Sequence, residues 1–261
     1  MSRYWRVYKQ FFLSSLQREL EFRANFVAKI LQNCVWIVFF LLIVLVIYRN
    51  TDSVAGWNRG DAFALAATVF LLGSFSHALF FSLTEIPEQV RRGTLDFVVT
   101  KPIDSQFWVG LRRFNFDQIG AIVAGVAMLV YGVTTSTHHA SFLAWTCYTV
   151  LFACAIVLYN SFMMILMTLG IWLVRVDNLW VLGETVQQIA RYPMDIFQPG
   201  MKSFLTFTLP LAFLAYVPAS QLVRGPDFPM LIIGAVWSIG LALAARVYWK
   251  FAMKHYSSAS S

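Results

Sequence analysis

Four polar residues in a weakly apolar part of the chain recur at the spacing of one helical face. Glu184, Gln187, Gln188 and Arg191 stand at positions i, i+3, i+4 and i+7, so a helix would turn them to one side. Such a carboxylate, two amides and a guanidinium can line a path for polar solutes. In a membrane span they must face protein or water, because one central charge costs about 2.5–3.5 kcal/mol. A cytoplasmic amphipathic helix with a solvated polar face fits the same periodicity.

Local motifs for enzyme chemistry are missing from the sequence. It has no G-x-x-x-x-G-K-[ST] phosphate loop, no HExxH and no GxSxG. His138 and His139 are adjacent in a short polar turn without a nearby carboxylate, which favours a solvated turn over a metal site. His77 lies in an apolar segment, where we expect a hydrogen bond to a neighbouring helix; a proton-linked role stays open. We therefore expect no enzyme active site, no metal site and no cofactor in this chain.

The longest polar interval between apolar segments covers residues 84–113. Pro87 suits the first turn of a helix, where its missing N–H costs little. Residues 88–92 can continue that helix for one or two turns, and Gly93 can end it in a left-handed cap. Pro102 interrupts the segment further on. The sequence therefore predicts a short charged helix within this loop.

An apolar group directly follows the predicted short helix. It consists of Leu95, Phe97, Val98 and Val99. A charged helix with an apolar shoulder, held between two membrane spans, is typical of a contact site for a soluble partner. The alternative is a solvated loop, because runs of charge are usually solvated faces.

The composition indicates an all-α integral membrane protein. Of the 261 residues, 59% are hydrophobic and 13% are charged, whereas ordinary soluble domains have about 25% charged residues. The apolar runs have the length of a membrane helix, about 20 residues, rather than of a barrel strand. The net charge of +7 comes from cations clustered at span ends, as expected of cytoplasmic loops rather than of nucleic-acid binding. The three cysteines lie in apolar segments, and we expect small buried residues rather than disulfides or zinc ligands.

The chain begins with an amphipathic helix at residues 3–22, in an N-terminal segment 1–27 that we expect at the cytoplasmic membrane interface. Trp5, Tyr8 and Phe12 recur on its apolar side. Six membrane spans are predicted to follow, with both termini in the cytoplasm because most lysines and arginines then lie inside. The predicted spans are about 28–48, 62–83, 116–134, 142–174, 179–197 and 230–249.

The fifth span is ambiguous from the pattern alone. Residues 203–223 are apolar, although prolines interrupt them, while residues 179–202 are only weakly apolar. Hydropathy would therefore make 203–223 the fifth span and 179–202 a cytoplasmic helix.

The polar loop resembles the first cytoplasmic loop of type-2 ATP-binding-cassette (ABC-2) exporter permeases. The similar stretch is EIPEQVRRGTLDFVVTKPI, which ends in a proline near the next span. In that family this loop is a coupling helix that docks in a groove of the ATPase subunit. The resemblance thus implies coupling to an ATPase for Glu85, Glu88, Arg91, Arg92, Gly93, Thr94 and Leu95.

Further resemblances to the family lie in the second half of the chain. Arg175-Val176-Asp177 resembles the turn before its fifth span, and Tyr192-Pro193 with the later prolines resembles its outer re-entrant hairpin. They favour a fifth span at 179–197 and a re-entrant segment at 200–224, and they place Glu184, Gln187, Gln188 and Arg191 along the translocation path. The RYP, LP and YxP elements are similar to those of bacterial viologen-exporter-type permeases.

The family implies the partners and the location of the chain. It implies a permease in the bacterial cytoplasmic (inner) membrane that exports a substrate, with ATP and Mg²⁺ bound by separate ATPase subunits. A second permease chain, identical or different, would complete the path. Two other classes stay open: a secondary transporter, and a membrane assembly protein without transport. Inverted repeats, frequent in secondary transporters, are not evident in the sequence.

Overall fold

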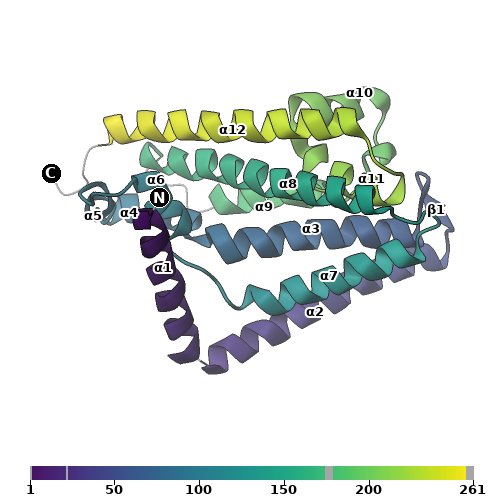
Figure 1. Ribbon diagram of the computed structural model, residues 1–261, viewed down its shortest axis with the longest axis horizontal. Coiled ribbons are helices and arrows are strands. Elements are labelled where there is room, and N and C mark those ends of the chain that lie inside the picture. The colour runs from purple at the N-terminus through teal and green to yellow at the C-terminus, as the bar shows by residue number, and fades with distance from the viewer. Residues whose placement is uncertain (1, 22, 174–178, 257–261) are drawn as a thin grey trace.

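Long helices laid lengthwise form the body of the molecule in the computed structural model, which describes residues 2–21, 23–173 and 179–256 (Figure 1). The first helix, α1, crosses the others at a steep angle at one end, where the polar loop and the end of α12 also lie. We call this the loop end. The opposite end carries the strands β1 and β2 and is called the hairpin end. The long helices are α1 (Ser2–Glu21), α2 (Arg23–Arg49), α3 (Arg59–Phe80), α7 (Gln118–Thr135), α8 (Phe142–Thr168) and α12 (Phe228–His255).

Five helical stretches among the described residues are long and apolar enough to cross a membrane. They match five of the six predicted spans and confirm a multi-pass, helical membrane protein. The sequence did not predict the small antiparallel hairpin of β1 (Ser53–Val54) and β2 (Trp57–Asn58) between the first two. The stretches are Leu31–Arg49, Arg59–Arg91, Gln118–Thr135, Phe142–Ile171 and Phe228–His255.

The predicted fifth span is represented by a short helix and an irregular continuation. Helix α9 (Leu179–Ile189) has 11 residues, or about 16 Å, against about 30 Å of hydrocarbon. The chain nevertheless follows α3 towards the hairpin end, since Glu184 lies beside His77 and Asp195 beside Trp57. A crossing at 179–197 stays a prediction, and the Arg-Asp turn expected before it lies outside the described residues.

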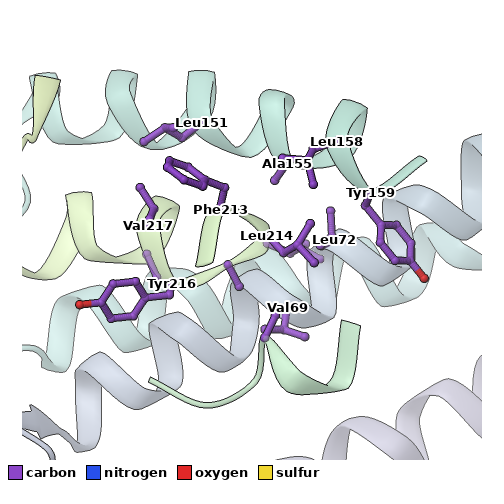
Figure 2. Packing of buried hydrophobic residues seen from close by; sticks show 14 of the residues in the cluster. Val69, Leu72, Leu151, Ala155, Leu158, Tyr159, Phe213, Leu214, Tyr216 and Val217 are labelled. Carbon is purple, nitrogen blue, oxygen red and sulfur yellow. The ribbon is translucent and has the colours of Figure 1, made fainter. Parts of the chain in front are cut away.

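Four short helical pieces replace the continuous helix that hydropathy alone would place at 203–223. Figure 2 shows Phe213, Leu214 and Val217 of this segment between side chains of α3 and α8. Arg224 Nη2 donates to Asp195 Oδ2 over 2.7 Å, so the segment starts and ends close together. The pieces are α10 (Pro199–Ser203), the π-helical η4 (Phe204–Thr208), and η5 (Pro210–Leu214) and α11 (Tyr216–Val223).

Helix α1 combines an exposed and a packed aromatic surface. Trp5 is 69% exposed, as an interface helix requires. Phe12, which we predict on the membrane side, packs edge-on against Phe116, with ring centroids 4.8 Å apart. Phe11 makes the same kind of contact with Trp108 at 4.8 Å. The helix is therefore anchored to the polar loop as well as suited to the membrane surface.

Helices α3 and α7 approach each other through glycines. A Cβ added at Gly132 would lie 2.6 Å from the backbone nitrogen of Ala64 and 3.0 Å from the carbonyl oxygen of Gly60. Such distances leave no room for a methyl group without a backbone shift. The small residues therefore permit backbone contact between the two helices, as in other membrane bundles.

Gly132→Ala is expected to lower the free energy of unfolding by about 1–3 kcal/mol, the usual cost of overpacking. The matched control is Gly240→Ala in α12, where an added Cβ meets nothing within 4 Å. There the better helix propensity of alanine should keep or raise stability. The melting temperature of each purified variant in detergent checks this. Equal melting temperatures for the two variants would show that α3 and α7 separate easily.

Candidate functional site

The polar loop folds into a series of short helices at the loop end. Pro87 lies in the first turn of α4, and Gly93 follows this helix with φ +68°, as the sequence predicts. The Gly93 N–H donates to the Val90 carbonyl over 3.1 Å, which closes the cap. The elements are η1 (Phe81–Glu85), α4 (Ile86–Arg91), α5 (Asp96–Val99) and α6 (Ser105–Leu111).

The charges of α4 form a local ion-pair group on its surface. Glu88 accepts hydrogen bonds from Arg91 and Arg92, one turn further along. Thr94 Oγ1 donates to the Gln89 carbonyl over 3.4 Å beside the cap. Exposed pairs of this kind are screened by water and contribute little to stability. These charges thus keep the helix surface polar and available rather than hold the fold together.

The apolar shoulder after α4 divides into an inner and an outer half. Leu95 and Val98 are buried, with 0% and 4% exposure, and join the hydrophobic core. Phe97 and Val99 point outwards and are 70% and 50% exposed. The loop therefore offers a rigid surface with an exposed phenylalanine, beside the charges of α4.

Glu85 connects the two ends of the polar loop. Its carboxylate accepts hydrogen bonds from Arg112 and from Arg113, the latter over 2.8 Å. Burial, followed by the like charge of Arg113, lowers the pKa of Arg112. Glu85 is thus the counter-ion that keeps two adjacent guanidinium groups together, where the loop leaves α3 and where it returns towards α7.

The predicted polar face of α9 turns partly inwards. The Glu184 carboxylate lies 3.0 Å from His77 Nε2 on α3, and Tyr159 Oη of α8 donates to it over 3.5 Å. Gln187 is buried, and its Nε2 donates to the carbonyl oxygen of Val69 over 3.2 Å. These two residues fasten α9 to its neighbours. His77 has the hydrogen bond to another helix that we expect of it.

The other two predicted pathway residues lie at the surface, one on α9 and one in the turn that follows it. Gln188 and Arg191 are exposed. Glu184 is half-buried beside this exposed surface, whereas Gln187 is buried and does not belong to it. The surface also includes the exposed Trp180 and Tyr192, so it carries both aromatic and polar groups.

A cleft of about 380 Å³ lies between α3, α8 and α9 next to Glu184. Its wall is mostly apolar and aromatic, with polar groups from His77, Asn160 and Glu184, which suits a small amphipathic molecule. No local pattern pointed to Tyr159 and Asn160, which stand in a long apolar run. Lining residues are Phe81, His77, Tyr159, Asn160, Trp180 and Glu184. Within the described part of the chain, no group of three or more His, Cys, Asp or Glu side chains could hold a metal ion.

Comparison with known proteins connects this geometry to a family. No curated protein matches the chain. A family model described as ABC-2 family transporter protein matches residues 34–260. The match extends from within α2 almost to the end of the chain and includes the polar loop, α9 and the short helices after it. Members of this family are transmembrane subunits of transporters rather than enzymes in their own right. The chain therefore belongs to the ABC-2 family of membrane transporter proteins.

Proposed function

We propose that this chain is the permease subunit of an ABC exporter, which forms the substrate path and is coupled to separate ATPase subunits. The ATPase subunits bind ATP and Mg²⁺, and two permease chains, identical or different, form one complex. The main observation behind this proposal is the polar loop. It contains a capped short helix between two spans, with Phe97 and Val99 exposed beside the charges of α4. Residues 84–113 thus have the shape and chemistry of a docking site for a soluble subunit.

The orientation follows from this docking site. The loop end faces the cytoplasm, and with it the start of α1 and the end of α12, which lie at that end (Figure 1). Both termini of the chain are therefore proposed to be cytoplasmic. The chain resides in the bacterial cytoplasmic membrane, and the hairpin end faces outwards. The segment 200–224 then enters the outer leaflet and returns. Tyr192-Pro193 precedes it and the prolines of η5 and α11 interrupt it, which supports the viologen-exporter-type branch.

The substrate path is proposed along α9, at the contact with the second permease. Helix α9 and the chain after it follow α3 between the two ends. Glu184, Gln188 and Arg191 contribute the polar groups, which lipid would not solvate. Gln187 supports the path by holding α9 to α3. The cleft beside Glu184 opens to the same region and offers room for a small molecule.

Purification of the tagged permease from its native membranes is expected to recover an ABC ATPase. Phe97→Ser should reduce that recovery several-fold, because it removes the exposed apolar contact without touching the core. Phe142→Ser is the matched control: Phe142 is 89% exposed, but it starts α8 at the hairpin end. Recovery of no ATPase with the wild type, together with transport that does not need ATP, would favour a secondary transporter.

The crossing of residues 179–197 is tested by cysteine labelling. In a variant without Cys34, Cys147 and Cys154, Arg191→Cys is expected to react with an impermeant thiol reagent added outside the cell. The reason is that residue 191 lies between the level of Glu184 and the hairpin end. Phe97→Cys in the same background should react only after the membrane is opened. Labelling at position 191 from the cytoplasm alone would overturn the topology.

A further inference from the structure

The last helix of the chain holds the polar loop by two adjacent side chains. Arg246 Nη1 donates to Asp104 Oδ1 over 2.8 Å and to Gln106 Oε1 over 2.7 Å, while its Nη2 bonds the other oxygen of Asp104. Three residues further along α12, Trp249 Nε1 donates to Ser105 Oγ over 3.0 Å. Trp249 is 1% exposed, so this is a packed contact. Residues 104–106 are therefore attached to α12 by a forked ion pair and a buried ring.

The same three residues are the start of α6. The Asp104 carboxylate also accepts the backbone N–H of Phe107 over 3.0 Å and so caps this helix. The other end of α6 is fixed by Ser82 Oγ, which donates to the Gly110 carbonyl over 2.9 Å, and by the Glu85 pairs just beyond it. Helix α6, seven residues long, thus connects η1, which leads directly into α4, with α12.

The charge of this contact is present at neutral pH. The Arg246 guanidinium holds the pKa of Asp104 below its usual value, so the carboxylate is ionised and the pair is a true salt bridge. Burial, with the Asp96 carboxylate of α5 also close, raises the pKa of Tyr256, just after α12, to about 12. The end of α12 therefore lies against α5 as well as against the start of α6.

Helix α12 is long enough to connect the loop with the membrane interior. Its 28 residues extend over about 42 Å, more than the hydrocarbon thickness of about 30 Å. Its last turns lie beside α5 and α6, and the rest packs along α8 (Figure 1). Helix α8 supplies Tyr159 and Asn160 to the cleft. A displacement of α6 would thus be transmitted to the cleft through α12 and α8. This route does not involve α3 and α7, the two helices that the loop joins covalently.

We propose that Arg246 is a positioning residue for transport. By binding Asp104 it connects α12 to the coupling loop, so that a movement of the loop is transmitted to α12 as well as to α3 and α7. Helices α3 and α7 move with the loop because they continue its chain. Helix α12 moves with it through the Arg246–Asp104 pair and Trp249. This inference rests on the proposed docking of an ATPase at residues 84–113.

The test compares transport-linked ATPase activity in complexes reconstituted with the native ATPase. Arg246→Ala is expected to reduce ATP-driven transport at least fivefold while the ATPase still co-purifies. Asp104→Asn should do the same, because asparagine keeps the helix cap and removes only the charge. The double variant should be no worse than either single one. Lys250→Ala, an exposed cation one turn further along α12, is the matched control and should match the wild type.

The possible results distinguish failure of the proposed role of Arg246 from failure of the proposed permease function. Transport at the wild-type level in the Arg246→Ala complex would refute the proposal that the Arg246–Asp104 pair transmits movement of the loop to α12. So would independent, additive losses in the two single variants, because the residues would then act separately. Arg246→Lys should recover only part of the activity, since an ammonium cannot make the forked contact. Failure of the wild-type chain to bind an ATPase would refute the proposed function itself.

Discussion

Replacing Glu85 with alanine is expected to uncouple ATP hydrolysis from transport, with a loss of about tenfold or more in ATP-driven export. The change leaves Arg112 and Arg113 adjacent without their shared carboxylate, although both are half-buried. Unpairing a fully buried charge costs about 3–5 kcal/mol. With 26–33% exposure, solvent screening reduces this to about 1–2 kcal/mol, close to a tenfold change in an equilibrium. Transport and ATPase activity of the reconstituted complex measure the effect.

Two further variants locate the cause of this loss. Glu85→Gln retains a hydrogen-bond acceptor without the charge, so its defect should be intermediate. Glu21→Ala removes an exposed carboxylate at the end of α1 and should leave transport unchanged. If Glu85→Ala transports as well as wild type while its melting temperature falls, the pairs stabilise the loop but do not transmit motion.

Helix α4 could be predicted because its signals are local. A proline in the first turn and a glycine at the cap determine where α4 begins and ends, and both do so in the structure. The same local sequence does not show that Leu95 and Val98 turn inwards while Phe97 and Val99 turn outwards. That division depends on the hydrophobic core beneath them, where α5 lies against α6. A sequence pattern therefore gives the helix, and only the packing gives its binding surface.

The polar residues of α9 show that helical periodicity does not predict which residues of one face are buried. Their spacing predicts one shared side, yet Gln187 is buried against α3 and Gln188 is exposed. The reason lies on α3: Gly73 has no side chain, and an added Cβ there would meet Gln187 Nε2 at 2.8 Å. This space receives the amide. A helical face spans about 100° and can be divided between two neighbours, and the position of those neighbours is not encoded in the helix itself.

The polar cluster around Asp195 is a second feature that no local sequence pattern predicts. The carboxylate accepts hydrogen bonds from Trp57 Nε1 over 2.8 Å, Lys202 Nζ over 2.6 Å and Arg224 Nη2 over 2.7 Å, and Tyr216 Oη donates to it over 3.0 Å. The donors come from the hairpin, from α10, from α11 and from the residue that follows α11. One anion thus joins both ends of the segment 199–223 at the hairpin end.

Asp195→Ala is expected to release this segment and lower the free energy of unfolding by about 1–3 kcal/mol. Trp57 is fully buried, so its indole N–H loses its partner, which costs about 1–3 kcal/mol. The two cations, 39% and 43% exposed, lose their counter-ion but keep their water, which adds little. Hydrogen–deuterium exchange of the purified protein should therefore accelerate in residues 199–223 and stay unchanged in α12.

A second aspartate at the same end of the molecule provides the control for this prediction. Asp227 is exposed and caps α12 by accepting the N–H of Met230 over 3.1 Å. Asp227→Asn keeps the cap, because asparagine is an equally good N-cap residue, and should change neither exchange nor melting temperature. Asp195→Asn keeps an oxygen that can accept from Trp57 Nε1 but removes the charge that Lys202 and Arg224 share, so it should be destabilising by less than Asp195→Ala. If both asparagine variants exchange at the wild-type rate in residues 199–223, the charge of Asp195 does not hold the segment. If Asp195→Ala does so too, the segment is held by its apolar contacts with α3 and α8 alone.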